Sequence, residues 1–455
     1  MIRQSLVSAF VVCLLIQPGA IQVAKAQASD PGSSATLTLE QAVAVAQQNN
    51  RQVKIKQLAV DKAEDQVAAA RTSRLPKFNF YTLGSQQLSQ IDFLFEQGVF
   101  GTFPGIGPVP DKDTNISSAR KPTFLIISSI TEPLSQQYQI GLNIEQLKMS
   151  REIAREQLRS EQQTLVNDVK RAYYAILQTQ SSLQTAEENI KLYRELDRVT
   201  GDYVAQQVAL RSENLEVKTR LAKAEYNALT LEDQLAIQKE QLNSLLGRDI
   251  NTQFNVSGAA EPVGFEFDLA AARDRALDRR PEVREARLKL KQAEMDRRIK
   301  KSEFIPEVSA SFNYISPRNY GTIVPKHIVS LGLVFSWEIF DWGKKRRQLD
   351  EKSKTVEQAR AGVEEAENQV VMDLNTRHRK LLQTRLQLRI AQLGQETARE
   401  TLRVTTNKYQ VQAALLSDVL QQQTTLADAN QQYLQAVFSY WTAKADFEKA
   451  TGEDK

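Results

Sequence analysis

An internal repeat limits the possible folds of this 455-residue chain more than any other feature. A shift of 230 residues aligns 39–76 with 269–306 without a gap, and a shift of 205 residues aligns 134–247 with 339–452. A repeat has to be recognised before single elements are assigned, since both copies are expected to build the same unit. The two shifts differ by 25 residues, so the first copy carries an insertion ahead of residue 134.

Both copies contain stretches that predict very long helices. Residues 142–200 have neither Gly nor Pro, and residues 344–451 have no Pro and only two glycines. Strong helix formers fill both stretches, and a helix of ~65 residues is about 100 Å long. Each copy therefore predicts a helix, a short β region, a very long helix, a turn and a second long helix. Such lengths are typical of coiled coils and helical arrays, and a soluble coiled-coil protein fits them as well.

Helix starts and a linker divide the chain. Thr38 followed by Gln41 fits a capping box, and Pro281 stands where a helix begins in the second copy. Residues 248–267 have no helical pattern and contain two glycines and a proline. The expected units are the first structural repeat, the linker and the second structural repeat, which span residues 27–247, 248–267 and 268–455.

Residues 1–26 have the pattern of a cleaved secretory signal peptide. Arg3 precedes an apolar run from Leu6 to Ile16, and an A-x-A site ends at Ala26. The run is too short to cross a bilayer, which takes ~20 residues. The only cysteine, Cys13, lies in this segment and does not follow a lipoprotein box. We therefore expect export without a lipid anchor, and a mature chain without disulfides.

Four short stretches alternate with period two. The clearest is His327 to Phe340, and the others are residues 307–315, 77–88 and 122–134. Alternation of this kind is typical of transmembrane β-strands, and also of a sheet packed on a soluble core. The lipid-facing candidates of the clearest stretch share one apolar face and are Val329, Leu331, Leu333, Phe335 and Trp337.

The number of strands has a consequence for assembly. The smallest bacterial transmembrane barrels use eight strands, so four strands require an oligomer, and three copies would supply twelve. The long loop at residues 89–121 is rich in Gly and Pro. Loops of this length lie on the outer surface of bacterial barrels.

Composition and motifs argue against several functions. The net charge of +4 gives no basic face for nucleic acid. Histidine is the commonest metal ligand and proton shuttle, but the chain has only two, His327 and His378, which lie far apart in sequence. The chain has no metal-ligand spacing, nucleophile elbow or phosphate-binding loop. We therefore expect neither an enzyme nor a bound cofactor.

Three motifs resemble the TolC-like outer-membrane efflux family, in the same order along the repeat. They are Leu37-Thr38-Leu39-Glu40-Gln41-Ala42, Phe340-Asp341-Trp342-Gly343 and Leu416-Ser417-Asp418-Val419-Leu420. The resemblance covers nearly the whole mature chain and implies a mainly α fold with a small transmembrane β part. It further implies a homotrimer in which each subunit gives four strands to a twelve-strand outer-membrane barrel, in contact with outer-membrane lipid. Long helices would form a periplasmic tunnel. The implied partners are a periplasmic adaptor and an inner-membrane pump or transporter that supplies the energy for efflux or secretion.

The resemblance also places functional residues at the two helical tips, near 204–212 and 409–417. Glu213 and Asp418 are equivalent across the repeat, and in a trimer they would form a ring of six carboxylates at the periplasmic constriction. The alternative is that they are solvated acids at helix starts, which the helix dipole favours. Tyr409 is a further gate candidate. The candidates for contact with an adaptor are Gln207, Ala209, Leu210, Gln412, Ala414 and Leu415.

The tips depart from the family pattern, because Gln207 and Gln412 stand where the family usually has a glycine. The alternative to a conduit is a soluble periplasmic coiled-coil adaptor or structural protein. Such a protein would have to bury the apolar strand faces in its own core. The sequence does not identify the substrate.

Overall fold

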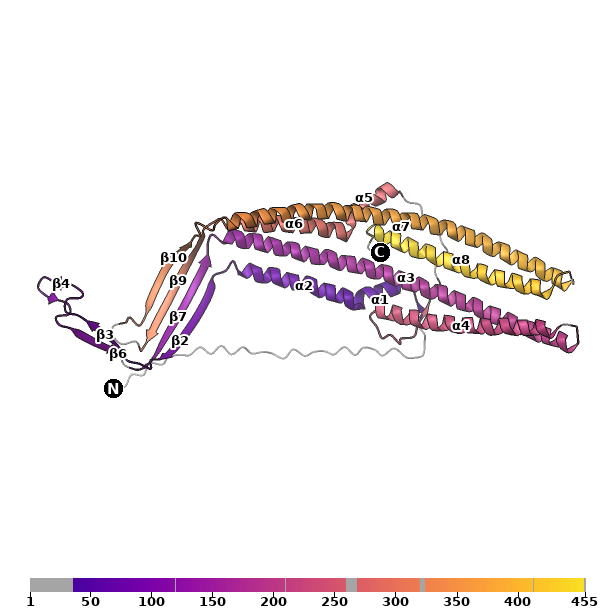
Figure 1. Cartoon of the computed structure of the whole chain (residues 1–455), viewed down its shortest axis with the longest axis horizontal. Helices are drawn as coiled ribbons and strands as arrows, with labels where there is room; N and C mark the ends of the chain where they lie inside the picture. The colour runs from indigo at the N-terminus through magenta and orange to yellow at the C-terminus, as the bar shows by residue number, and fades with distance from the viewer. Residues whose placement is uncertain are drawn as a thin grey trace, which may run out of the picture.

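The computed structural model is elongated, with a β-sheet at one end and two helical hairpin turns at the other (Figure 1). The predicted signal peptide, residues 1–26, lies outside the described residues. The structure describes residues 36–118, 120–208, 210–258, 268–319, 324–411 and 413–453.

Each repeat contains the two long helices that were predicted, but two shorter helices precede them where one was expected. In both repeats the third helix is the longest, with 69 residues in α3 and 67 in α7. None of the described helices combines the length and apolar character needed to cross a membrane. The helices of the first repeat are α1 (Leu39–Asn49), α2 (Arg51–Thr72), α3 (Gln137–Ala205) and α4 (Arg211–Leu245). Those of the second are α5 (Leu269–Arg279), α6 (Pro281–Ser302), α7 (Lys344–Gln410) and α8 (Leu416–Ala450).

Both predicted helix starts are confirmed. The Thr38 hydroxyl accepts a hydrogen bond from the Gln41 backbone N–H at 3.2 Å, and the Gln41 side chain accepts one from the Thr38 N–H at 3.1 Å. Pro281 occupies the start of α6. Its missing N–H costs nothing there, because the first N–H groups of a helix have no intrahelical acceptor.

A single residue separates the two short helices of each repeat, and its chemistry differs between the copies. Asn50 caps α2 by accepting from the Gln52 N–H at 2.8 Å, and its amide donates to the Leu245 carbonyl at 2.9 Å. Arg280 takes the equivalent place before α6 and is buried. Its guanidinium pairs with Glu282 at 3.1 Å and with Asp373 of α7 at 2.6 Å. The same backbone joint therefore uses an amide in one copy and an ion pair in the other.

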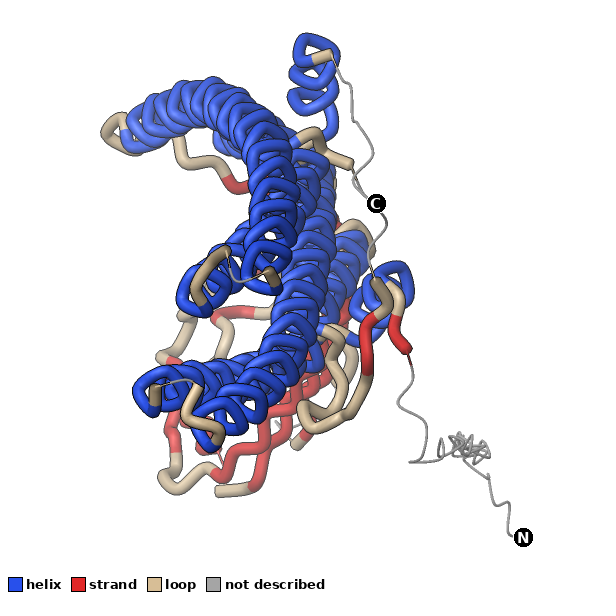
Figure 2. The backbone as a smooth tube through the Cα atoms, turned by 90° about the vertical axis from the view of Figure 1, so that its right-hand side faces the viewer, coloured by secondary structure: helices blue, strands red, loops and turns tan. Residues whose placement is uncertain are grey.

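The helices form a curved layer in which α3 is central (Figure 2). It packs against α2, α4, α6 and α8, and α7 packs against α6 and α8. Two buried clusters fill this layer at mid-length, one around Tyr173 and Leu242 and the other around Leu374 and Phe447. Along one side of the layer lie α2 and α4, and along the other lies α7.

Four strands make one antiparallel sheet in the order β10-β9-β7-β2. The strand predicted to reach Phe340 ends at Ser336, so the prediction of Trp337 as a strand residue is wrong. Trp337 lies in the segment that turns from the strand toward α7. The strands are β2 (Lys77–Gln86), β7 (Pro122–Pro133), β9 (Glu307–Arg318) and β10 (Ile328–Ser336).

The insertion of the first repeat is folded, although a loop was expected at 89–121. It forms a two-stranded β-ribbon that projects beyond the four-stranded sheet (Figure 1). Its base is the pair β3 and β6, and its tip is the short pair β4 and β5. Their bounds are β3 (Ile91–Phe95), β4 (Thr102–Phe103), β5 (Gly107–Pro108) and β6 (Thr114–Ser118).

The segment predicted as a linker also contains ordered structure. Two short parallel strands, β1 (Thr36–Leu37) and β8 (Asn255–Val256), pair at mid-length of the molecule. The hydroxyl of the buried Tyr173 lies 2.9 Å from the Leu37 carbonyl and 3.0 Å from the Ser257 carbonyl. This contact ties the start of the folded chain and the segment between the repeats to the central helix α3.

Candidate functional site at the helical tips

The turn between α3 and α4 closes with a left-handed residue. The Val208 N–H donates to the Tyr203 carbonyl at 2.9 Å, and the Gln207 N–H donates to the Val204 carbonyl at 3.0 Å. These two bonds define a Schellman motif, which requires a left-handed residue that is usually glycine. Gln207 fills that place with φ of 60°. The glycine expected from the family therefore has a clear conformational role, which Gln207 fulfils at the cost of strain.

The turn between α7 and α8 has the same outer bond, because the Ala413 N–H donates to the Lys408 carbonyl at 2.8 Å. Gln412, the counterpart of Gln207, lies outside the described residues, as does Ala209. The remaining candidates for adaptor contact are mostly exposed. Leu210 and Leu415 are 68% and 70% exposed, and Ala414 is half-buried. The two tips thus present apolar side chains to their surroundings.

The two tip acids are exposed and have different local roles. Asp418 lies in the first turn of α8, where its carboxylate accepts a hydrogen bond from the Leu415 N–H at 3.0 Å. This is one half of a capping box. Glu213 lies in the first turn of α4, and Leu210 offers that helix no side-chain cap. Both acids are placed favourably toward the positive end of a helix, but only Asp418 makes a capping bond.

Tyr409 lies near the other hairpin. It is the second-last residue of α7 and is half-buried. Partial burial raises the pKa of its hydroxyl above the ordinary value, and nearby Tyr203 and Glu213 raise it further. The structure therefore brings Tyr409 close to Glu213 of the other hairpin.

Residues that the sequence analysis missed hold the hairpins together just above the tips. Val217 of α4 and Leu420 of α8 are buried with Tyr193 of α3. Nearby, the guanidinium of Arg220 donates to the hydroxyl of Thr424 at 3.0 Å. The only sequence signal for these residues is helical periodicity, which does not say which helix lies opposite.

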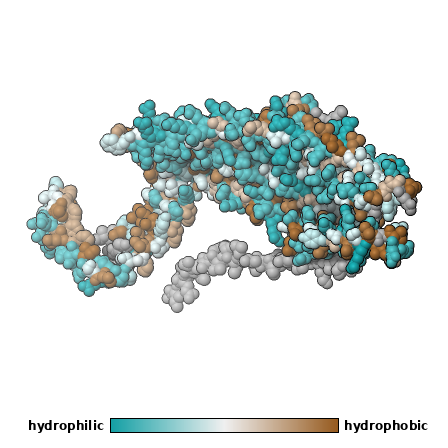
Figure 3. Space-filling view, turned by 45° about the vertical axis from the view of Figure 1, so that its right-hand side comes forward, coloured by the Kyte–Doolittle hydropathy of each residue, from teal (hydrophilic) through white to brown (hydrophobic). Residues whose placement is uncertain are grey.

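The four-stranded sheet has one strongly apolar face. Directly opposite residues of antiparallel strands share a face, so the register places Leu331 beside Phe312, Phe312 beside Ile130, and Ile130 beside Phe78. Figure 3 shows this hydrophobic surface on the strands, in contrast to the hydrophilic helices. Four of the five lipid-facing candidates lie in β10 on this face, and they are exposed: Val329 60%, Leu331 80%, Leu333 72% and Phe335 63%.

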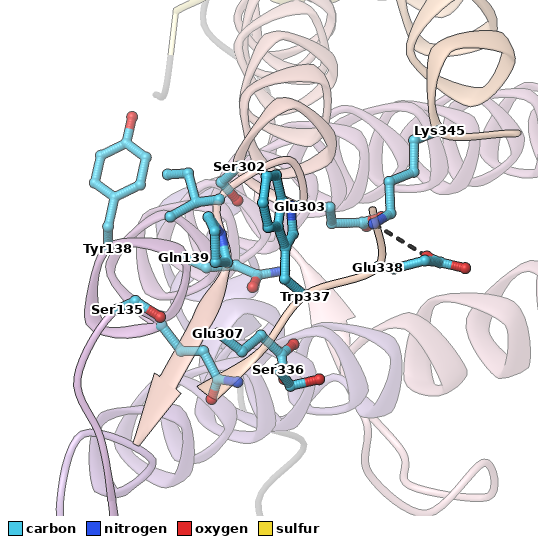
Figure 4. Close-up of a pocket in the computed structure, with 13 residues that line it drawn as sticks. Ser135, Tyr138, Gln139, Ser302, Glu303, Glu307, Ser336, Trp337, Glu338 and Lys345 are labelled. Carbon is cyan, nitrogen blue, oxygen red and sulfur yellow. Dashed lines mark ion pairs between the residues drawn. The ribbon is translucent and has the colours of Figure 1, made fainter. Parts of the chain in front are cut away.

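The junction between the sheet and the helices contains a hollow (Figure 4). Trp337 and Tyr138 stand at its wall, and Lys345 forms an ion pair with Glu338 at 3.1 Å. Just outside it, the Asp341 carboxylate accepts from the backbone N–H groups of Gly343 at 3.0 Å and Lys345 at 2.7 Å. These bonds lower the pKa of Asp341, the Lys345 N–H having the largest effect. The Phe340-Asp341-Trp342-Gly343 motif thus caps α7 at the point where the strand turns into the helix.

No group of three or more His, Cys, Asp or Glu side chains in the described residues is arranged to hold a metal ion. The tips also bring no nucleophile and base together among the contacts described above. The described residues combine an apolar strand face, long helices and two helical tips.

Comparison with known proteins identifies the family. The family model described as outer membrane efflux protein matches residues 42–248 and 272–453, so the chain belongs to that family. It is therefore a subunit of an outer-membrane efflux channel. The prediction of a channel is confirmed, and the soluble coiled-coil alternative is set aside.

Solved structures show the same fold at low sequence identity. A membrane protein from Pseudomonas aeruginosa is 16% identical with a TM-score of 0.75, covering 91% of this chain and 90% of that one. The outer membrane protein VceC from Vibrio cholerae is 14% identical with a TM-score of 0.72, covering 91% and 96%. The outer membrane channel CmeC from Campylobacter jejuni is 15% identical with a TM-score of 0.72, covering 91% and 85%.

One relative by sequence is an uncharacterized protein from Haemophilus influenzae, 21% identical over 250 residues. The match covers 53% of this chain and 54% of that protein, so the aligned part spans about half the length of each.

Proposed function

We propose that three copies of this chain close into a ring that conducts substrates from the periplasm to the exterior. The observation that carries this proposal is that the sheet and the helical layer both have two free edges, and that these edges lie on corresponding sides of the subunit. In the sheet, β2 and β10 each have one neighbouring strand. In the helical layer, α4 and α7 lie at opposite sides. An edge of this kind needs a partner, and a head-to-tail contact that closes on itself makes a ring.

The two edge helices carry exposed apolar stripes that support the same contact. On α4, Leu215, Tyr226 and Leu229 are 52%, 74% and 56% exposed. On α7, Leu386 and Leu393 are 60% and 56% exposed. At 100° per residue, the side chains of each set point into one sector of roughly 80° around the helix axis. In the ring, the α4 stripe of one subunit packs against the α7 stripe of the next.

The apolar face of the sheet then contacts outer-membrane lipid, and the helices extend into the periplasm. The predicted signal peptide, residues 1–26, is the proposed export signal. A twelve-strand barrel follows from three four-stranded sheets, and it satisfies the requirement that a membrane sheet has no open edge.

The tips form the proposed gate. Opening moves the α7–α8 hairpin away from the α3–α4 hairpin, which separates Leu420 from Val217 and Arg220 from Thr424. Glu213, Asp418 and Tyr409 line the constriction. A periplasmic adaptor docks on the exposed apolar tip residues Leu210 and Leu415, and an inner-membrane pump or transporter supplies the energy.

Paired cysteines test the ring. Leu229 of α4 lies 18 residues beyond the first residue of its helix, and Leu393 of α7 lies 17 residues before the last residue of its helix, so both are at similar height. We expect the double variant Leu229→Cys/Leu393→Cys to give covalent dimers and trimers, and nothing larger, when the detergent-extracted protein is oxidised.

Each single variant serves as a control, because a head-to-tail contact does not bring a residue against its own copy. A monomer at all oxidant concentrations would refute the ring. A ladder beyond three subunits would refute its closure.

A further inference from the structure

The β-ribbon of the first repeat has one apolar face that is about half exposed among the described residues. In the pair β3–β6, Phe93 lies opposite Ile116, and Ile91 lies opposite Ser118 on the same face. Ile91, Phe93 and Ile116 are 47%, 52% and 43% exposed. The other face carries Asp92 opposite Ser117 and Leu94 opposite Asn115.

The ribbon is an ordered element because hydrogen bonds continue to its tip. The Gly98 N–H donates to the Pro110 carbonyl at 2.9 Å, and the Phe100 N–H donates to the Val109 carbonyl at 3.0 Å. The Asp113 carboxylate accepts from the Gln97 N–H at 2.8 Å. The rings of Phe95 and Phe100 lie 5.4 Å apart. An element with this internal bonding keeps its apolar side chains together on one face.

The ribbon projects from the edge of the sheet, at the end remote from the helical tips (Figure 1). It connects β2 with β7, and β2 is one of the two edge strands of the sheet. The other hairpin, β9–β10, has a much shorter connection between Arg318 and Ile328. In the proposed ring, each ribbon therefore stands at a subunit boundary beside a short neighbouring hairpin. Three ribbons surround one mouth.

The dimensions allow the ribbons to meet. Twelve strands spaced ~4.8 Å apart and tilted by ~40° give a barrel radius of roughly 12 Å. The five residues of β3 alone span about 16 Å at ~3.3 Å per residue. A ribbon that bends inward at its base therefore reaches the barrel axis.

We propose that the three ribbons pack their Phe93 faces against one another across the outer mouth and close it on the exterior side. This inference rests on the proposed trimer. The apolar face of each ribbon is covered by the same ribbons of the second and third copies. The three ribbons together form an outer lid, which is separate from the gate at the helical tips. A membrane surface fits less well, because segments that lie on membranes are rich in Lys and Arg. Residues 91–118 contain one basic residue, Lys112, and four acidic ones.

Adjacent cysteines on opposite faces test the lid. Phe93 and Leu94 are both apolar and exposed, at 52% and 66%, but they point to opposite faces of β3. The only native cysteine, Cys13, lies in the predicted signal peptide. In trimers reconstituted in lipid nanodiscs and treated with a short bismaleimide, we expect Phe93→Cys to crosslink subunits at least tenfold more than Leu94→Cys.

A functional readout accompanies the crosslinking. We expect the double variant Phe93→Asp/Ile116→Asp to increase single-channel conductance in bilayers severalfold, whereas the control Leu94→Asp leaves it unchanged. Equal crosslinking at the two positions, or selective labelling of Phe93→Cys by a lipid-soluble maleimide, would overturn the lid. The Leu229→Cys/Leu393→Cys pair reports the trimer independently. Trimers without Phe93→Cys crosslinks would refute the lid alone, and absence of trimers would refute the proposed function.

Discussion

Gly247 and Gly452 are equivalent in the repeat, and the structure predicts that replacing them with alanine has unequal costs. Each follows the last long helix of its copy, with φ of 68° and 77°. A Cβ at Gly247 would lie 2.2 Å from the backbone oxygen of Asn49. At Gly452 the nearest atom is the Arg279 Cβ, at 3.1 Å. The first contact is impossible without backbone movement, and the second needs an adjustment of a few tenths of an ångström.

The magnitudes follow from two contributions. A left-handed backbone costs a non-glycine residue about 1–2 kcal/mol at either site. At Gly247 the clash also pushes α4 away from the junction of α1 and α2, where the Asn50 amide donates to the Leu245 carbonyl. Loss of that bond costs about 1 kcal/mol, and loosening around the buried Leu242 and Leu246 adds on the order of 1–2 kcal/mol. We therefore expect Gly247→Ala to cost about 3–5 kcal/mol and Gly452→Ala about 1–2 kcal/mol.

Urea unfolding of the detergent-solubilised full chain, followed by far-ultraviolet circular dichroism, measures the difference. Gly394→Ala is the matched control, because Gly394 lies within α7 and its added Cβ meets nothing within 4 Å. That change should stabilise the protein by about 0.5–1 kcal/mol. Equal losses of unfolding free energy for Gly247→Ala and Gly452→Ala would show that close approach of the Asn49 backbone does not set the cost. A loss for Gly394→Ala would contradict the same reasoning.

Four further predictions concern the joint, the tips and the sheet. Arg280→Met should cost about 1.5–3 kcal/mol, because Asp373 loses its charged hydrogen bond to Arg280 and keeps the one from Arg377 at 3.1 Å. Burial opposes ionisation of Asp373, but Arg280 lowers the pKa of its carboxyl in the folded state. The stabilisation by this ion pair is therefore present above the unfolded pKa of about 4. It is lost as the pH falls through the lower folded pKa. Acid titration should therefore destabilise wild type more than the variant below about pH 4. Gln207→Gly should stabilise the tip by about 1 kcal/mol and slow amide hydrogen exchange there. Faster exchange would show that the left-handed backbone of Gln207 is not strained. Leu420→Ala should cost about 2–5 kcal/mol of local packing and raise the open probability in bilayers; an unchanged open probability would contradict a role of this cluster in closure. Leu331→Arg should cost about 2–4 kcal/mol at the membrane midplane, while Ser330→Arg on the other face should insert normally; equal insertion would refute the lipid-facing assignment.

The sequence predicted those parts of the fold that depend on local patterns. The long helices follow from composition and from the absence of Gly and Pro, and the structure places them at Gln137–Ala205 and Lys344–Gln410. Strand positions follow from alternation, which is equally local, and β2 begins at the predicted residue, Lys77. Strand ends are less certain from sequence, because Trp337 continues the apolar alternation after the last ladder pair at Ser336.

Contacts between distant segments could not be predicted in the same way. Arg220 and Thr424 lie 204 residues apart, and neither has a local signal that names the other. The ribbon was missed because its glycines and prolines predict turns, which hid the short strands between them. The left-handed conformation of Gln207 was missed because glutamine has no preference for it; only the repeat and the family pattern point to that position.

The two tip acids illustrate how the copies have diverged on a common backbone. Asp418 accepts from the Leu415 N–H at 3.0 Å, so its removal should first loosen the start of α8. Glu213 instead contributes to the raised pKa of Tyr409, so its removal should first alter the contact between hairpins. A trimer would therefore carry two different sets of three carboxylates and not six equivalent ones. We expect Asp418→Asn, which keeps a hydrogen-bond acceptor, to preserve the turn, and Glu213→Gln to change the ion selectivity and opening of the pore. Identical effects of the two substitutions on bilayer currents and on tip amide exchange would show that the repeat equivalence, and not the local contacts, determines their roles.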